Sequence, residues 1–440
     1  MKTDCRLTFL GILGPLKTTF SVIGSLWWLY LPVLFTAGAI TGWVNYVTQR
    51  YLLSLKWVLL EIKPPPDVEK SPKIAENIFS GLHASYQPVK WKKRFVVGEV
   101  PDWYSLELVG NGGDIHFFIR VREAFRKVVE NIIFAQYPDA EIKEADDYIL
   151  TLPKYLPSEN YDLFGSTLIF TKEDAYPIRT YPFFEEESGR GESKRTDPLA
   201  PLAEAMASLQ PGEHIWLQIL IRPTGDSWVK EAQKVVDKII GKEVKRELSF
   251  EGKAVEGVGK VFSSLFEATG IIGSAEKKEE KKKEDFNLQK LTPGQKLALE
   301  QVEYKIAKLG FKTNIRFIYL ARKELFNRSH ISSVIGMFKQ LYSNNMNTFR
   351  PDPKTITFHK GLLRIIFPSD KGFFAKQLEF KRKTKIYKNY RARSFIKKVL
   401  ILNTEELATL FHLPGIGLKA PAFPRVEAKR GQPPAGLPTK

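Results

Sequence analysis

Hydrophobic and polar residues alternate in the body of the chain with the periods of helices and strands. Apolar side chains at every second position predict a strand over 115–121, and a turn rich in Gly and Asn joins it to the apolar run 104–109 as a β-hairpin. Apolar residues at helical spacing predict helices after Ser71-Pro72 and over 123–137, and a strand follows at 140–144. This order predicts one sheet packed against helices.

The order helix, apolar strand, helix recurs twice farther along the chain. The predicted elements are 199–209, 214–222 and 228–240 in the first recurrence, and 293–309, 312–320 and 330–342 in the second. This is a repeat of pattern and not of sequence, and it predicts two related α/β sandwich units. The predicted fold class is therefore α+β.

The N-terminal region has no charged residue from Thr18 to Gln49. Residues 20–47 predict one transmembrane helix, because the stretch is long and apolar and has aromatic residues near both ends. A cleaved signal peptide is disfavoured, since the stretch is too long and no A-x-A site follows it. A buried core helix is the alternative. Residues 1–19 are predicted to lie at the membrane interface.

Basic residues on the two sides of this stretch predict its orientation. Three precede it, and five follow it within residues 50–73. This asymmetry favours a cytoplasmic side for everything that follows the stretch. The predicted location is the inner (cytoplasmic) membrane, with a single span and a cytoplasmic C-terminal body.

These patterns divide the chain into successive segments. The predicted segments are an interfacial segment (1–19), a transmembrane helix (20–47), a first α/β region (48–184), a second helix-strand-helix region (197–273), a charged linker (274–290), a third helix-strand-helix region (291–370), a basic aromatic segment (371–398), and a helix motif with a Pro-rich tail (399–440).

The composition adds a charge surplus to this picture. The 440 residues include 67 Lys and Arg against 49 Asp and Glu, a formal net charge of +18. Such a surplus attracts anions such as nucleic acid or acidic lipid headgroups. The single cysteine, Cys5, has no partner for an internal disulfide, which favours a reducing compartment.

Motifs for catalysis are weak. Residues Gly257–Lys260 carry only a fragment of a P-loop, without the four-residue gap or the following Ser or Thr that phosphate binding needs. The six histidines form no HExxH motif and have no cysteine partners for zinc. The chain also lacks a GxSxG motif. We therefore expect no enzyme activity, no cofactor and no metal site.

The basic aromatic segment 371–398 is the most informative part of the body. It holds eleven Lys or Arg and one acid, Glu379, with aromatic residues between them. Such a mixture suits nucleic acid, where cations pair with phosphates and rings stack on bases, and it also suits an acidic membrane. A basic strand or connector whose rings pack on the body is the structural alternative. The candidate contact residues are Lys381, Arg382, Lys383, Lys385, Tyr387, Lys388, Tyr390, Arg391 and Arg393.

A short helix is predicted near the end of the body. Thr404 can cap it, and Glu405 and Glu406 in its first turn face the positive end of the helix dipole. Its apolar side is a candidate docking face for an ATPase or for a second copy of the chain, with a plain core helix as the alternative. The candidate docking residues are Leu407, Leu410 and Phe411.

Several motifs together resemble a known region of other proteins. They are WVLLEIKPP at 57–65, Ser71-Pro72, GLH at 81–83, the hairpin 105–120, AQYP at 135–138, LQPGE at 209–213 and LNTEELATLFHLP at 402–414. This combination resembles the membrane-anchored region found ahead of FtsK/HerA-type ATPases of bacterial type IV secretion and conjugation systems. The resemblance spans roughly residues 20 to 438 and marks fold and assembly more than chemistry.

In such proteins an ATPase core with a P-loop follows the last motif, whereas this chain ends at Lys440 after a Pro-rich stretch. The resemblance thus implies a membrane-anchored, non-enzymatic assembly component of a type IV secretion-like or conjugative DNA transfer apparatus. Its implied partners are the membrane, a separately encoded P-loop ATPase, nucleic acid and further copies of the chain. The alternatives are the detached N-terminal part of a DNA-translocating ATPase and a membrane-tethered binder of nucleic acid or lipid.

Overall fold

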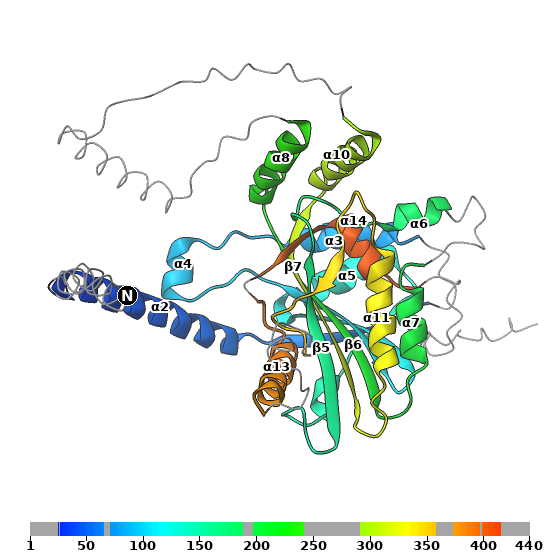
Figure 1. Cartoon of the computed structure of the whole chain (residues 1–440), viewed down its shortest axis with the longest axis horizontal. Coiled ribbons are helices and arrows are strands. Elements are labelled where there is room, and N and C mark those ends of the chain that lie inside the picture. Colours follow the sequence, from blue (N-terminus) through cyan, green and yellow to red (C-terminus); the bar gives the residue numbers. More distant parts are fainter. Residues whose placement is uncertain are drawn as a thin grey trace, which may run out of the picture. The chain divides into compact units, whose positions relative to one another are not determined.

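The computed structural model of the chain describes residues 25, 27–65, 71–187, 197–241, 291–357, 373–396 and 398–414. The chain forms two compact units, whose elements are drawn in Figure 1. Unit 1 lies within residues 1–57 and 86–102, and unit 2 lies within residues 58–85 and 103–440.

Unit 1 contains a long helix and a short one. They are α2 (Trp27–Ser54) and α4 (Trp91–Val96). The indole nitrogen of Trp43 on α2 donates a hydrogen bond to the carbonyl oxygen of Phe95 on α4, at 3.0 Å. After α4 the chain turns at Gly98, whose φ of 76° favours glycine. A Cβ atom at Gly98 would lie 2.3 Å from the backbone of Val47, so this close approach requires glycine.

The predicted transmembrane helix is wrong. Among the residues that the structure describes, no helix is both long enough and apolar enough to cross a bilayer. Helix α2 extends past the uncharged stretch to include Arg50, and Pro32, two glycines and several polar residues dilute its apolar character. Most of its described side chains are exposed, so it is not a buried core helix either. The predicted interfacial segment 1–19 lies outside the described residues.

Unit 2 is built on one nine-stranded sheet. Its strands are β1 (Trp57–Lys63), β2 (Tyr104–Asn111), β3 (Asp114–Arg122), β4 (Glu141–Glu144), β5 (Tyr161–Phe170), β6 (Glu213–Pro223), β7 (Gly310–Arg322), β8 (Phe349–Pro351) and β9 (Leu400–Asn403). Their order is β4-β1-β3-β2-β6-β7-β5-β8, and β9 also pairs with β7. The central pairs β2–β6, β6–β7 and β5–β7 are antiparallel.

The predicted β-hairpin is confirmed. Strands β2 and β3 pair antiparallel up to Asn111 and Asp114, which leaves Gly112 and Gly113 as the turn. Both glycines have positive φ, at 57° and 103°, which a two-residue hairpin turn with the twist of the strands needs.

Helices cover both faces of the sheet. They are α3 (Lys73–His83), α5 (Arg126–Gln136), α6 (Tyr181–Glu187), α7 (Ala200–Ala207), α8 (Ser227–Ile240), α10 (Pro293–Ile306), α11 (Arg328–Gln340), α13 (Phe373–Arg391) and α14 (Thr404–Leu410), with short 3-10 turns η1 (Glu123–Phe125) and η2 (Tyr148–Thr151). Buried residues of α3, α5, α7, α11 and α14 share the largest hydrophobic cluster with one face of the strands. Figure 1 shows α7 and α11 side by side against the sheet.

Helix α13 lies on the opposite face. Because side chains of a strand alternate between faces, Leu106 and Leu108 of β2 join the large cluster, whereas Val109 packs with Tyr387 and Tyr390 of α13. Glu107 of β2 points to the same face as Val109. The centre of the sheet therefore carries a charged side chain, Glu107, on the face that α13 covers.

The prediction of two related α/β sandwich units is wrong, because the strands form one sheet, although the α+β class is correct. Strands β5 and β6 belong to the first half of the chain and β7 to the second, yet β7 lies between them in one continuous sheet. A helix-strand-helix pattern shows the local elements but does not show which strands pair. The charged linker predicted at 274–290 lies outside the described residues.

Candidate functional site

The predicted contact residues lie on helix α13 and on the turn after it. The segment is helical and not an extended connector. Its side chains divide into two sets according to burial. Lys383, Tyr387, Tyr390 and Arg393 are buried, Arg382 and Arg391 are partly buried, and Lys381, Lys385 and Lys388 are exposed.

The two tyrosines of the buried set form part of the core. The Tyr387 hydroxyl donates to the carbonyl oxygen of Pro153 at 2.9 Å, and the hydroxyls of Tyr390 and Tyr148 lie 2.8 Å apart. The Tyr390 ring also stacks on Trp216, with 5.6 Å between ring centroids. The prediction that Tyr387 and Tyr390 stack on bases is therefore wrong, because neither ring reaches solvent.

Lys383 is neutralised inside the protein. Its Nζ lies 2.8 Å from an Asp162 carboxylate oxygen and 2.7 Å from a Glu379 carboxylate oxygen. Glu379, the single acid of the basic segment, thus forms its ion pair with Lys383 on the same helix. Lys383 is excluded as a contact for nucleic acid or lipid.

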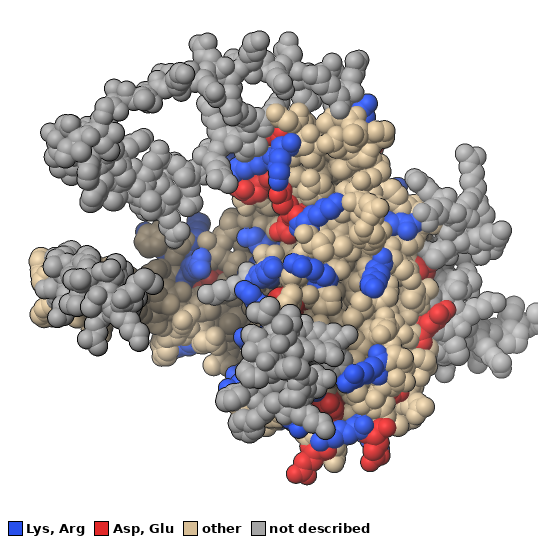
Figure 2. All heavy atoms as spheres, viewed as in Figure 1, with Lys and Arg blue, Asp and Glu red and all other residues tan. Residues whose placement is uncertain are grey.

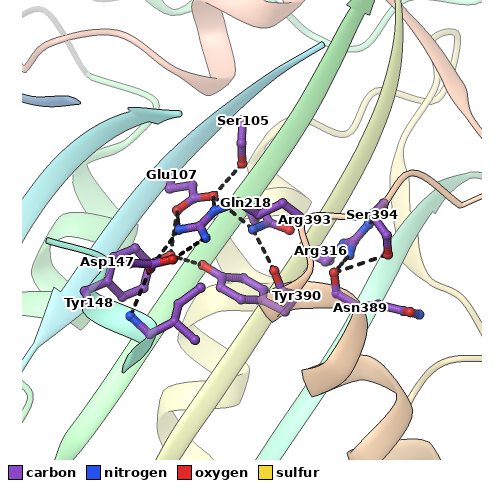
Figure 3. Close-up of polar contacts among 11 residues, drawn as sticks. Ser105, Glu107, Asp147, Tyr148, Gln218, Arg316, Asn389, Tyr390, Arg393 and Ser394 are labelled. Atoms are coloured by element: carbon purple, nitrogen blue, oxygen red, sulfur yellow. Dashed lines mark hydrogen bonds and ion pairs between the residues drawn. The ribbon is translucent and has the colours of Figure 1, made fainter. Parts of the chain in front are cut away.

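Arg393 is the centre of a buried polar network, drawn in Figure 3. Its guanidinium binds Glu107 at 2.6 and 2.9 Å and Asp147 at 2.6 and 3.0 Å, so it contacts both oxygens of each carboxylate. Such paired contacts are the strongest geometry for an arginine and a carboxylate. Arg393 is excluded as a surface contact for the same reason.

The end of α13 explains how Arg393 reaches the sheet. Arg393 has a φ of 46°, a left-handed conformation that commonly ends helices. The Ser394 N–H donates to the Asn389 carbonyl, and the Arg393 N–H donates to the Tyr390 carbonyl, which closes the last turn. The reversal of the backbone points the Arg393 side chain back toward β2.

Three further side chains hold Glu107. Hydroxyl groups of Ser105 and Tyr148 and the amide of Gln218 all donate to its carboxylate. Burial alone would raise the pKa of Glu107, but the charge and hydrogen bonds of Arg393 outweigh it and hold this pKa below its ordinary value. The pKa of Asp147 is also lowered, since contact with Arg393 outweighs burial there. Both groups are therefore carboxylates at neutral pH.

A second arginine, Arg316 of β7, binds the end of the same helix. Its guanidinium donates to the carbonyl oxygens of Asn389, at 2.5 Å, and of Ser394. The Asn389 carbonyl lies in the last turn of α13, at the negative end of the helix dipole, and Ser394 follows the helix. Burial lowers the pKa of Arg316 to about 10, so it stays charged at neutral pH and complements this end.

The centre of this network is closed, while Asp147 at its edge has a side chain that is 31% exposed. Glu107, Arg393 and Tyr390 are almost completely buried, and their polar atoms bind one another. A reactive group needs access to a substrate, and these groups have none in this arrangement. The network fixes the C-terminal end of α13 on the centre of the sheet.

The exposed set forms a line on the outer face of α13. Lys381, Lys385 and Lys388 are spaced i, i+4 and i+7, which places them on one side of a helix over roughly 10 Å. Among the described residues, no carboxylate forms an ion pair with any of the three. We call these three lysines the α13 stripe.

Other basic side chains extend the positive character of unit 2. In the part of the body that grey atoms do not cover, Figure 2 shows Lys and Arg spread over the middle of the face in view, with few acids between them. Arg382 is held by a hydrogen bond to the Ile356 carbonyl, at 3.2 Å. The ring of Phe380, beside the stripe, is 55% exposed.

Comparison with known families identifies the family of the chain. The model of a family described as a domain of unknown function, DUF8128, matches residues 51–422. The chain belongs to this family. A comparison with curated proteins finds no match. The DUF8128 region includes the whole described sheet, α13 and α14, whereas all but the last turn of α2 precedes it.

The predicted docking helix is part of the core of the DUF8128 domain. Leu407 and Leu410 are almost completely buried, and Phe411 packs against Phe117 with ring centroids 5.8 Å apart. The docking prediction is therefore wrong, and the alternative of a plain core helix is what the structure shows. The helix cap is Asn403 and not Thr404, because the Asn403 side chain accepts from the Glu406 N–H in a capping box.

Buried charges attach α14 to its neighbours. Lys305 of α10 pairs with Glu406 at 3.0 Å, with both side chains fully buried. Burial raises the pKa of Glu406 despite this contact. At the partly exposed rim, Lys308 binds Glu76 of α3 at 3.1 Å and also contacts Glu405.

His412, which follows α14, pairs with Asp197 in the same region. In His412 one ring nitrogen faces the Ala408 carbonyl at 2.8 Å, and the other faces Asp197 at 3.1 Å. Both partners accept hydrogen bonds, so a ring with protons on both nitrogens, which is cationic, satisfies both contacts. Burial lowers the pKa of His412, but Asp197 and the carbonyl outweigh it and raise this pKa overall.

Proposed function

We propose that this DUF8128 protein is a non-enzymatic assembly component that holds nucleic acid by its phosphate backbone on the α13 stripe. The observation that carries the proposal is the line of three exposed lysines that have no carboxylate partner among the described residues, on a helix anchored to the sheet by Arg393 and Arg316. A fixed helix keeps the three cations in line without the entropy cost of ordering a loop.

The burial of the tyrosines determines the mode of binding that we propose. Stacking on exposed bases would need Tyr387 and Tyr390 at the surface, and both belong to the core. The stripe offers ammonium groups, which pair with phosphates and carry no sequence information. We therefore expect duplex and single strands to bind similarly, without preference for a base sequence.

The buried network supports a non-enzymatic role. Groups with strongly shifted pKa values in an open cleft are candidates for catalysis. In this protein Glu107 and Asp147 have lowered pKa values because they hold Arg393, and Glu107 and Arg393 are almost completely buried. The shifts are thus explained by anchoring of α13.

The resemblance to the region ahead of FtsK/HerA-type ATPases supports a place in a type IV secretion-like or conjugative DNA transfer apparatus. We propose a separately encoded P-loop ATPase as the partner. Because Leu410 and Phe411 are buried, this ATPase would use another surface. Identification of proteins that co-purify with the tagged full chain tests this point. Recovery of a P-loop ATPase in an amount equal to that of the tagged chain would support this partner. Preparations that contain nucleic acid but no ATPase would contradict it.

Nucleic-acid binding is tested by fluorescence anisotropy with the full chain and labelled 20-mers, single-stranded and duplex. The variant Lys381→Gln, Lys385→Gln, Lys388→Gln should bind both about 30-fold or more weakly at low salt, since it loses three phosphate contacts. The matched control is Lys92→Gln, Lys93→Gln, Arg94→Gln in unit 1, which removes the same charge. Equal loss in both variants would mean that net charge alone governs binding and would contradict the proposal.

A further inference from the structure

The short helix α4 of unit 1 exposes basic, aromatic and aliphatic side chains together. All six of its residues are exposed, with Trp91 at 71% and Val96 at 70%. Lys90 precedes the helix and exposed Val97 follows it. We call residues 90–97 the α4 patch.

The α4 patch is held in place on α2. The Trp43 indole donates to the Phe95 carbonyl, and the close approach of Gly98 to Val47 fixes the chain after the helix. The Val97 and Glu99 N–H groups both donate to the Lys93 carbonyl, at 3.0 and 3.3 Å. The exposed side chains therefore project from an ordered backbone.

The patch carries a surplus of positive charge. Four of its first five residues are Lys or Arg. Among the described residues, Glu99 is the carboxylate that pairs with them, at 3.3 Å from Lys93. Lys92 lies over the ring of Trp91, with its Nζ 5.9 Å from the centroid. Lys90, Lys92 and Arg94 thus remain without a carboxylate partner in the part of the chain that the structure describes.

Aromatic rings of α2 lie beside this charge. The rings of Trp43 and Tyr46 contact each other with centroids 6.2 Å apart, and both are more than half exposed. Tryptophan and tyrosine prefer the headgroup level of a bilayer, where their rings are apolar and their polar tips stay wet. Lysine and arginine beside them can reach acidic headgroups while their stems cover apolar surface.

We propose that the α4 patch, with Trp43 and Tyr46, binds the headgroup layer of a bilayer that contains acidic lipids. Charge complementarity selects an anionic surface, and exposed Val96 and Val97 select one that also offers apolar contact. The phosphate backbone of nucleic acid offers charge but no apolar layer into which exposed aliphatic side chains can be buried. The proposal concerns attachment to the surface, with α4 in the interface, and needs no spanning helix.

Co-sedimentation of the full chain with vesicles tests this proposal. Vesicles of phosphatidylcholine with about one third phosphatidylserine should bind the protein, and pure phosphatidylcholine vesicles should bind it far less. Each basic residue near an acidic leaflet contributes roughly a fivefold change in affinity, so Lys92→Gln, Lys93→Gln, Arg94→Gln should weaken binding about 100-fold. The stripe variant Lys381→Gln, Lys385→Gln, Lys388→Gln is the matched control and should bind vesicles like the wild type.

A second variant tests the apolar part. Trp91→Ala with Val96→Ser should weaken binding to the acidic vesicles at least tenfold, while circular dichroism stays unchanged because both side chains are exposed. Undiminished vesicle binding in either α4 variant, or no binding by the wild type, would overturn the proposal. Nucleic-acid binding serves as the independent readout, since the α4 variants should retain it and the stripe variant should lose it.

Discussion

Arg393 binds Glu107 through two hydrogen bonds, of 2.6 and 2.9 Å, although 286 positions separate the two residues in the chain. Glu107 lies on β2 at the centre of the sheet, and Arg393 ends α13. The contact therefore joins the first hairpin of the DUF8128 domain to the helix that carries the exposed lysines. The buried ion pair between Arg393 and Glu107 thus holds the α13 stripe in place.

Loss of this ion pair should destabilise the fold. Arg393→Met leaves Glu107 and Asp147 without their cation, and an uncompensated buried charge typically costs about 3 to 5 kcal/mol. Urea unfolding should show a loss of this size. The control Lys388→Met, on the exposed side of the same helix, should change the free energy of unfolding by less than about 0.5 kcal/mol. Equal effects of the two variants would refute the anchoring role.

A double-mutant cycle separates the pair from its surroundings. Glu107→Gln and Arg393→Met should each destabilise the protein, and the double variant should lose less than the sum because one substitution removes the partner that the other leaves unpaired. We expect a coupling of about 1 to 3 kcal/mol. Additive losses would show that the two residues act independently.

The pH dependence of stability should report His412. Its pKa in the folded protein lies above the ordinary 6.5, because Asp197 and the Ala408 carbonyl outweigh the effect of burial. The stabilisation from His412 is then complete below pH 6.5 and is lost as the pH rises through the folded pKa. For Asp197 the folded pKa lies below 3.8, so its contribution is lost only as the pH falls through that lower value.

The variant His412→Gln tests this assignment. The free energy of unfolding of the wild type should exceed that of the variant most at about pH 5.5, and the difference should shrink by about pH 9, by roughly 1.4 kcal/mol for each unit by which folding raises the pKa. Chemical denaturation across this range measures it. A difference that grows with pH would mean that His412 is buried as the neutral ring.

A charge in place of Leu410 should unfold unit 2. The side chain is almost fully buried, and an unpaired carboxylate in such a place belongs to the changes that cost more than about 4 kcal/mol. Leu410→Asp should lose the cooperative unfolding transition, whereas Leu53→Asp, at a leucine that is 85% exposed, should keep it. A folded Leu410→Asp variant that fails to associate with a partner would restore the docking hypothesis.

Much of the fold could be predicted from local pattern. The hairpin follows from alternation and from a Gly-Gly turn, and α8, α10 and α11 follow from helical spacing. Strand β5 is less evident, since Gly165 interrupts its apolar run. That glycine has a packing reason: a Cβ there would lie 3.0 Å from the Phe317 backbone oxygen of β7 and 3.2 Å from the Ile386 side chain of α13. Both partners lie far along the chain from Gly165.

The candidate site was predictable in part. The density of charge pointed to α13, and Lys381, Lys385 and Lys388 are indeed exposed. Burial of Lys383 and Arg393 could not be seen, because their partners Asp162 and Glu107 lie on remote strands. Helical spacing of the apolar residues in this segment could have indicated one buried side. The α4 patch was missed because a six-residue helix shows little periodicity.

The salt dependence of duplex binding tests the nucleic-acid proposal most directly. Each phosphate contact contributes about 0.9 to the slope of log affinity against log salt concentration, so removal of the α13 stripe should reduce the magnitude of this slope by roughly 2.7. Anisotropy titrations between about 50 and 200 mM salt, with the wild type and with Lys381→Gln, Lys385→Gln, Lys388→Gln, give both slopes. The account predicts the reduced slope in the variant. An unchanged slope, or a wild type that does not bind at low salt, would contradict it.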